Sequence, residues 1–357
     1  MIYTNVILKI KMKTINKLHN PLSNFKQSFL AHSFISKIIS KKQNHPFWIM
    51  VQKETTDHVC SWRFIILLLL ITITCFGSLY NSLNHLSEVL NNAKDPNHMF
   101  AFLRILTTSD GTLPPFHVFI GFLGPLLGIS LGFDAINSEQ NNGSLVRIIS
   151  QPIHRDYLIN AKFVAGLIII VSLFFTLNFL FVGFGILATG LTPNPEEFLR
   201  IIAFTLLVIL YVSFWLNLSI LFSIKFKQAA TSALSAIAVW LFFTVFFQIL
   251  INIIAKVFIP TNTTNPNHAL AYKNFFLKLI NIAPNQLYND ATTTLLAPTI
   301  RSLGPLSYSQ TYGAIPSALP LRESLLIVWP QLTGLIAITI LCFAISYYLF
   351  MKREIRA

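Results

Sequence analysis

The residues best able to do chemistry lie in one polar segment, residues 134–162, between two long apolar segments. It reads DAINSEQNNGSLVRIISQPIHRDYLINAK. Its acids include Asp134 and Glu139, and its bases include Arg155 and Lys162. Such groups form ion pairs and charge-assisted hydrogen bonds, either within a chain or with a soluble partner. We therefore expect this segment to be a contact surface rather than a catalytic centre.

The rest of the chain offers little chemistry of its own. It contains no H-E-x-x-H metal motif and no G-x-x-x-x-G-K-[ST] loop that could cradle phosphates, so we predict no catalytic residue and no metal site. Three histidines fall in predicted outer loops without metal-ligand spacing: His85, His98 and His268. His117 is interpreted as an interfacial histidine in preference to a proton relay.

The elements that position the polar segment are apolar helices. The chain has 357 residues, of which 54% are hydrophobic and 11% charged, and its mean hydropathy is +0.63. Segments of about 20 apolar residues span a bilayer as helices, and the absence of period-2 alternation disfavours a β-barrel. We predict an all-α membrane protein with six transmembrane helices, near 63–82, 115–134, 163–190, 201–224, 229–256 and 325–350.

Charge distribution orients these spans. The net charge is +13, and most Lys and Arg residues fall on the side that holds both termini. The positive-inside rule makes that side cytoplasmic, in a plasma (inner) membrane. The basic charge is thereby explained by topology and by anionic lipid, and we expect no nucleic-acid partner.

The N-terminal part has several interpretations. Residues 1–47 form a basic cytoplasmic leader without acidic residues. Disorder, a basic arm on the membrane and an extension upstream of a start at Met50 all remain open, while a cleaved signal is disfavoured. Apolar spacing from Trp48 to Trp62 favours an amphipathic entry helix that leads into the first span.

Two further features concern packing. Gly124, Gly128 and Gly132 form a small-xxx-small ladder that lets a neighbouring helix approach closely. The outer loop, 257–324, is expected to make one or two short helices on the membrane face. Uncharged polar residues inside the spans favour hydrogen bonds between helices over a substrate path: Asn178, Asn217, Gln248, Asn252 and Gln331.

The polar segment itself predicts a short helix parallel to the membrane. Glu139 precedes a turn at Gly143, an apolar patch begins at Leu145, and Pro152 stops it before Arg155. An amphipathic contact helix and an ordinary interfacial loop helix fit this pattern equally well.

The same residues resemble the signature of type 2 ABC transporter permeases. The matching positions are Asp134, Glu139, Gly143, Ser144, Leu145, Pro152, Arg155 and Lys162. The resemblance covers a six-span permease domain, residues 48–357, with the entry helix that carries Lys53 and Glu54.

This resemblance implies the permease subunit of an ABC transporter, with export favoured over import. The subunit would have no ATPase site of its own and would work with a cytoplasmic ABC ATPase and a second permease subunit. ATP and Mg would be bound by the ATPase, and this chain would bind no cofactor. The segment between spans 2 and 3 would be a cytoplasmic coupling helix. Glu139 and Arg155 would either contact the ATPase or brace the helix within this subunit.

The sequence does not identify the substrate. The outer-loop segment NIAPNQLYND resembles permeases of gliding motility and copper-enzyme maturation, and the charge-free spans favour an amphipathic or lipid-like substrate. A membrane scaffold without transport and a proton-coupled carrier are the alternative functions.

Overall fold

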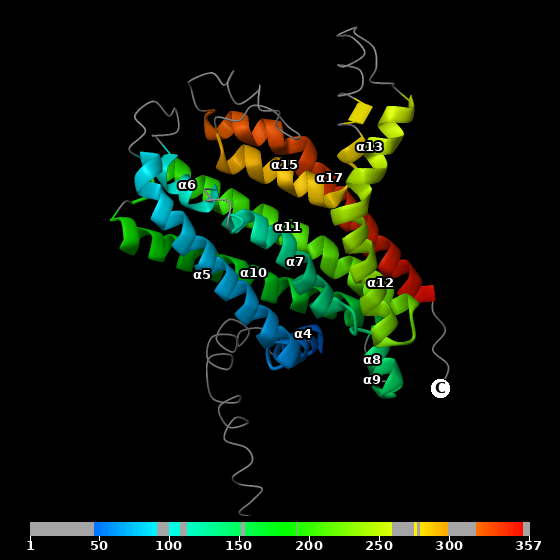
Figure 1. Cartoon of the computed structure of the whole chain (residues 1–357). Coiled ribbons are helices and arrows are strands. Elements are labelled where there is room, and N and C mark those ends of the chain that lie inside the picture. The colour runs from blue at the N-terminus through cyan, green and yellow to red at the C-terminus, as the bar shows by residue number, and fades with distance from the viewer. Residues whose placement is uncertain are drawn as a thin grey trace, which may run out of the picture.

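The computed structural model describes residues 46–90, 100–107, 113–150, 154–190, 192–258, 275–276, 279–298 and 319–352, and these are almost entirely helical (Figure 1). The longer helices are α4 (Pro46–Val59), α5 (Trp62–Leu90), α7 (Phe116–Gly132), α10 (Arg155–Thr189), α11 (Pro195–Lys225), α12 (Ala229–Leu241), α13 (Phe247–Phe258), α15 (Pro284–Leu296) and α17 (Leu321–Lys352). The shorter ones are α6 (Ala101–Thr107), α8 (Asn137–Asn141), α9 (Ser144–Ile149) and the π-helical turn η3 (Phe242–Phe246).

Six of these elements are long and apolar enough to cross a membrane: α5, α7, α10, α11, the continuous α12–η3–α13, and α17. Their mean hydropathies lie between 1.8 and 2.5, and no strand occurs among the described residues. The prediction of a six-span, all-α membrane protein is confirmed.

Local sequence explains where the long helices begin and end. Asn194 and Glu197 form a capping box at the start of α11, with Pro195 at its first position. Gly190 ends α10 in the left-handed conformation, with φ +69°. Several helices extend past the predicted apolar spans because their polar flanks also favour helix.

The core of the bundle surrounds α11, which packs against α7, α10, α12, α15 and α17. The predicted glycine ladder lies on the face of α7 that meets α11. A Cβ built on Gly128 would lie 2.7 Å from the backbone oxygen of Val212, and one on Gly132 would lie 2.8 Å from that of Leu216. The two backbones approach this closely because these positions lack side chains.

The outer loop departs from expectation, because α15 lies inside the bundle instead of on its surface. The helix runs antiparallel to α11, so that Leu295 O accepts a hydrogen bond from Arg200 Nη1 at 3.0 Å and Asn285 Oδ1 accepts one from Tyr211 Oη at 2.9 Å. Asn285 Nδ2 also donates to Thr244 Oγ1 in η3 at 2.6 Å. These polar anchors and the stacked rings of Tyr211 and Tyr288 explain why the helix inserts between the spans.

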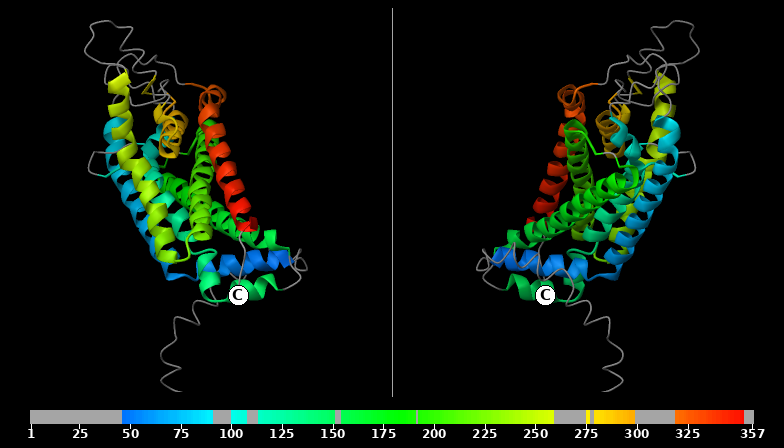
Figure 2. Two further views of the ribbon diagram at one scale, coloured as in Figure 1. Left: turned by 90° about the vertical axis from the view of Figure 1, so that its right-hand side faces the viewer. Right: turned by 90° about the vertical axis from the view of Figure 1, so that its left-hand side faces the viewer.

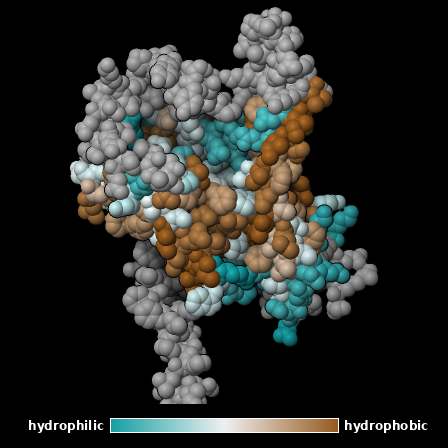
Figure 3. Space-filling model, in the orientation of Figure 1, coloured by the Kyte–Doolittle hydropathy of each residue, from teal (hydrophilic) through white to brown (hydrophobic). Residues whose placement is uncertain are grey.

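Both described ends of the chain lie at one end of the bundle, which we call the terminal face. Helix α4 lies across this face, next to α8 and α9 (Figure 2). Hydrophobic residues cover the middle of the molecule, and hydrophilic ones gather at the terminal face (Figure 3). The polar segment of the sequence therefore lies where the apolar band ends.

Candidate functional site

The polar segment folds into two short helices where one was expected. Helix α8 and helix α9 are separated by Gly143, whose φ of +68° is in the left-handed region that favours glycine. Leu145, on α9, is 2% exposed and belongs to the main hydrophobic core. The pair is thus fixed to the bundle by an apolar anchor at one end of a sharp turn.

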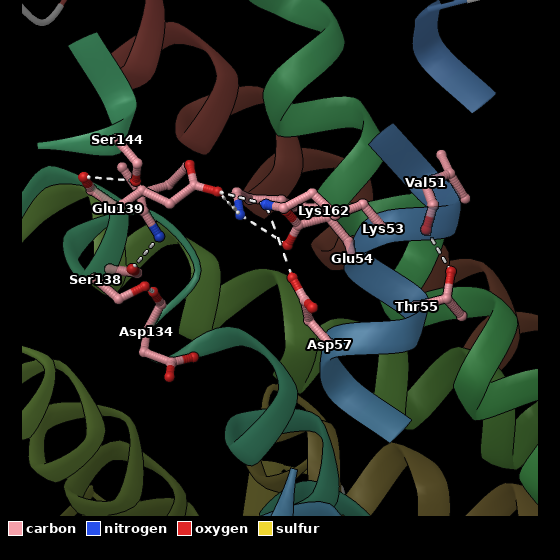
Figure 4. A network of polar contacts seen from close by, with 12 residues as sticks. Val51, Lys53, Glu54, Thr55, Asp57, Asp134, Ser138, Glu139, Ser144 and Lys162 are labelled. Atoms are coloured by element: carbon pink, nitrogen blue, oxygen red, sulfur yellow. Dashed lines mark hydrogen bonds and ion pairs between the residues drawn. The ribbon is translucent and has the colours of Figure 1, made fainter. Parts of the chain in front are cut away.

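A buried lysine links α8 to the entry helix (Figure 4). Lys162 Nζ, on α10, lies 2.8 Å from Glu54 Oε2 on α4 and 2.9 Å from Glu139 Oε1 on α8. All three residues are less than 10% exposed. Charge-assisted hydrogen bonds of this length are strong, and a buried charge requires such partners.

A second lysine completes this cluster from the solvent side. Lys53 Nζ lies 3.1 Å from Glu54 Oε1, 3.7 Å from Glu139 Oε1 and 3.8 Å from Asp57 Oδ2. Burial raises the pKa of Glu54, but Lys162 and Lys53 outweigh it and the net pKa is lowered, so Glu54 is ionised at neutral pH. We call Lys53, Glu54, Glu139 and Lys162 the ion junction.

Further contacts attach the same region to spans 1 and 4. Arg63 Nη1 at the start of α5 lies 2.7 Å from Asp134 Oδ2, just after α7. Near the end of α11, Ser223 Oγ accepts hydrogen bonds from the backbone N–H groups of Ile136 at 2.8 Å and Asn137 at 3.2 Å. The turn after α7 and helix α8 together therefore contact four longer helices: α4, α5, α10 and α11.

Arg155 is directed toward a different part of this subunit. Its Nη2 donates to Phe350 O at 2.8 Å, and its guanidinium lies 5.0 Å from the centre of the Phe350 ring. Arg155 thereby joins the first turn of α10 to the last turns of α17. The geometry of Glu139 and Arg155 favours the interpretation that both brace the subunit internally.

The remaining sequence candidates are distributed as follows. Pro152, His98 and His268 lie outside the described residues, as does the side chain of His85. His117 Nδ1 lies 3.2 Å from Leu106 O, as expected of a satisfied histidine. In the described part of the chain, no cluster of His, Cys, Asp and Glu could hold a metal ion.

Polar residues within the spans differ in their surroundings. Asn178 Nδ2 donates to Phe174 O in its own helix at 3.0 Å. Asn217 is 1% exposed, and neither its amide nitrogen nor its amide oxygen has a partner among the described residues. Gln248 is exposed on α13, whereas Asn252 is half-buried and Gln331 buried.

Sequence reasoning assigned no site role to Lys53, Glu54, Arg63 or Arg147. Glu54 and Arg63 were read as parts of the entry helix and the first span, yet they supply partners for Lys162 and Asp134. Arg147 is exposed on α9. The sequence carries only a weak signal for Glu54, because an acid in an amphipathic entry helix can also lie on its polar, solvent-facing side.

Comparison with known proteins identifies the class of molecule. The model of a family described as "ABC-2 family transporter protein" matches residues 48–355. The chain is also 30% identical over 135 residues to "Probable ABC transporter permease protein NosY" of Pseudomonas aeruginosa. That alignment covers 36% of this chain and 46% of the relative, so it spans about half of the relative's length.

Proposed function

Because this chain belongs to the ABC-2 transporter family, we propose that it is the permease subunit of an exporter driven by a separate cytoplasmic ATPase. The chain is a multi-pass membrane subunit of an ABC transporter. The further proposal concerns coupling: α8 and α9 form the surface on which the ATPase acts. It is supported chiefly by the ion junction, which connects α8 to α4 and α10.

The junction suits a coupling role because of what it joins. A push on α8 reaches α10 through Glu139 and Lys162, and reaches α4 through Lys162 and Glu54. The same push reaches α11 through Ser223. Buried charged contacts are short and directional, so they transmit a displacement better than a flexible loop would.

The outer side of α8 and α9 provides the docking surface in this proposal. Asn141, Asn142, Gly143 and Arg147 are exposed there. Since Glu139 and Arg155 point into this subunit, we assign ATPase contact to Arg147 and bracing to the other two. ATP and Mg are bound by the ATPase, because this sequence contains no phosphate-binding loop.

The proposed orientation of the chain in the membrane follows from the distribution of its basic residues. Placing the terminal face in the cytoplasm of a cell with an inner membrane satisfies the positive-inside rule and exposes α8 and α9 to a soluble ATPase. The spans contain few charges, which favours an amphipathic or lipid-like substrate.

We also propose that a second permease subunit covers the fifth span. Only 11% of the most apolar window of that span is buried in this subunit, against 72% for α11. Gln248 is exposed in this span. An amide facing lipid is unfavourable, and a second subunit would provide hydrogen-bond partners.

Reconstitution with the ATPase subunit tests the coupling. Glu139→Ala and Arg147→Glu should each lower ATP turnover of the assembled complex by about tenfold, which corresponds to about 1.4 kcal/mol of activation free energy. Asp156→Asn, which changes an acid of the same face outside the junction, should leave turnover unchanged. Unchanged turnover in both test variants, with the complex intact, would contradict the assignment. Transport that survives ATP depletion and collapses with the proton gradient would indicate a proton-coupled carrier instead.

A further inference from the structure

A pocket of about 270 Å³ opens beside the ion junction at the terminal face. It lies between α4, the first turn of α5, the end of α7 and α8. Its charged lining residues are Lys53, Glu54, Asp57, Arg63, Asp134, Glu139 and Lys162. Its volume corresponds to roughly nine water molecules, and a small polar group of lipid headgroup size fits such a space.

One buried carboxylate oxygen of a lining residue, Glu139, lacks a hydrogen-bond partner in the described part of the chain. Glu139 is 8% exposed, and its Oε2 has no hydrogen-bond partner among the described residues, although Oε1 is bound to Lys162. A buried carboxylate oxygen without a donor is costly. Three serine hydroxyls of the pocket do not supply one, because Ser138, Ser144 and Ser61 donate to backbone oxygens.

The charges of the lining favour a cationic donor. Four carboxylates, those of Glu54, Asp57, Asp134 and Glu139, face three cations, Lys53, Arg63 and Lys162. His58 does not restore the balance, since burial lowers the pKa of its imidazole and leaves it neutral at neutral pH. A ligand with an ammonium group would supply both the missing donors and the missing charge.

The mouth of the pocket favours an anion and an apolar chain. The side chains of Lys53 and Arg63 are each 56% exposed there. Next to Arg63, the exposed residues of α5 form an apolar stripe, with Trp62 62%, Ile66 60% and Leu69 54% exposed. A ligand with an ammonium group inside the pocket, an anionic group at its rim and a hydrocarbon chain along the first span is an aminophospholipid.

We propose that this pocket binds the headgroup of a phosphatidylethanolamine. The ammonium group donates to the Glu139 carboxylate, the phosphate lies beside Arg63 and Lys53, and the acyl chains follow the exposed stripe of α5. Binding does not depend on the ATPase. Its consequence, that a bound headgroup strengthens the ion junction and raises coupled ATP turnover, rests on the proposed function.

Native mass spectrometry of the purified, delipidated chain tests the binding. We expect phosphatidylethanolamine to be retained about tenfold better, or about 1.4 kcal/mol, than phosphatidylcholine and phosphatidylglycerol with the same acyl chains. Glu139→Gln should bring the three lipids close to equal retention. Asp156→Asn, an acid of the same face outside the pocket, should retain the preference. Equal retention of the three lipids by the unaltered chain would overturn the proposal.

A second series keeps the test independent of whether Glu139→Gln folds. Successive N-methylation of the ethanolamine headgroup removes hydrogen-bond donors without removing its charge. Retention by the unaltered chain should fall with each methyl group. Constant retention across the series would overturn the ammonium contact. If the unaltered chain showed no headgroup preference while ATP coupling was normal, the lipid proposal would fail and the coupling role would stand.

Discussion

Replacing Lys162 by Met should destabilise the protein more than any other single change at the terminal face. Lys162 is 4% exposed, and its ammonium group lies within 3 Å of two buried carboxylates. Its removal leaves Glu54 and Glu139 close together, with only the half-exposed Lys53 nearby. Breaking a buried ion pair from one side costs about 3–5 kcal/mol, a large fraction of the 5–15 kcal/mol typical of a folded domain.

The assay is thermal unfolding of the purified chain in detergent, followed by tryptophan fluorescence. The matched control is Lys227→Met, which removes an exposed lysine of the same face. A compensated variant, Lys162→Met with Glu54→Gln and Glu139→Gln, leaves no buried charge unpaired. It should recover most of the lost stability, because neutral replacement of a whole buried ion cluster is often tolerated.

Two results would refute this reasoning. If Lys162→Met were as stable as Lys227→Met, the ion junction would contribute nothing to the folded state. If the compensated variant were no more stable than Lys162→Met alone, the loss would come from packing of the lysine stem and not from its charge.

Four other perturbations have definite expected outcomes. Because the pKa of Glu54 is lowered, its contribution to the stability of the folded state is present above the ordinary pKa of 4.5 and is lost as the pH falls below that value. The melting temperatures of the unaltered chain and of Glu54→Gln should therefore converge in acid. A difference in melting temperature that stays constant with pH would contradict this prediction. Burial raises the pKa of Asp290 from 3.8 to about 6, so the ionised carboxylate destabilises the folded state. Asp290→Asn should therefore stabilise the chain by up to roughly 3 kcal/mol at pH 7.5 and by about half of that at pH 5. Thermal unfolding at both pH values measures the difference. Gly128→Ala should cost about 1–3 kcal/mol because its Cβ would meet backbone atoms of α11, whereas Gly183→Ala, with open space around it, should stabilise by up to about 1 kcal/mol. Arg200→Lys should lower the free energy of unfolding by about 2–3 kcal/mol, because lysine has fewer donors than the fully buried guanidinium. The partners of that guanidinium are Glu196, Leu295, Leu319 and Ser324. The control Arg322→Lys, at an exposed position, should leave the stability unchanged.

The spans were predictable from sequence because their physical requirement is local. About 20 residues without charge suffice to cross hydrocarbon, and each span carries that property within itself. The turn at Gly143 was likewise visible, since glycine is the residue that adopts its positive φ most readily.

The ion junction could be predicted only in part, because its members are far apart in the chain. Glu139 and Lys162 stood out as charges beside apolar segments, but Glu54 lies 108 residues before Lys162. Their contact depends on how α4 lies across α10, which is set by the packing of Val51 against Ala161 and Ala165. No spacing rule encodes that packing.

The position of α15 could not be predicted for a related reason. Its sequence is too short and too polar for a span, which favours a surface helix. It enters the bundle because its polar residues find partners on other helices, as Asn285 does with Tyr211 and Thr244. Arg200, which directly precedes the predicted span 201–224, also holds α15 in place by donating to Leu295 O.

The most direct test of the coupling proposal is a distance measured between two spin labels in the complex with the ATPase. One label replaces the exposed Ser150 just after α9, and the other replaces Leu187, which is 82% exposed near the far end of α10. The native cysteines at 60, 75 and 342 are first removed. We predict that a non-hydrolysable ATP analogue changes this distance in the chain with an intact ion junction. The change should be absent from the compensated Lys162→Met, Glu54→Gln and Glu139→Gln variant, which still binds the ATPase. An equal change in both proteins would contradict the role of the ion junction in coupling.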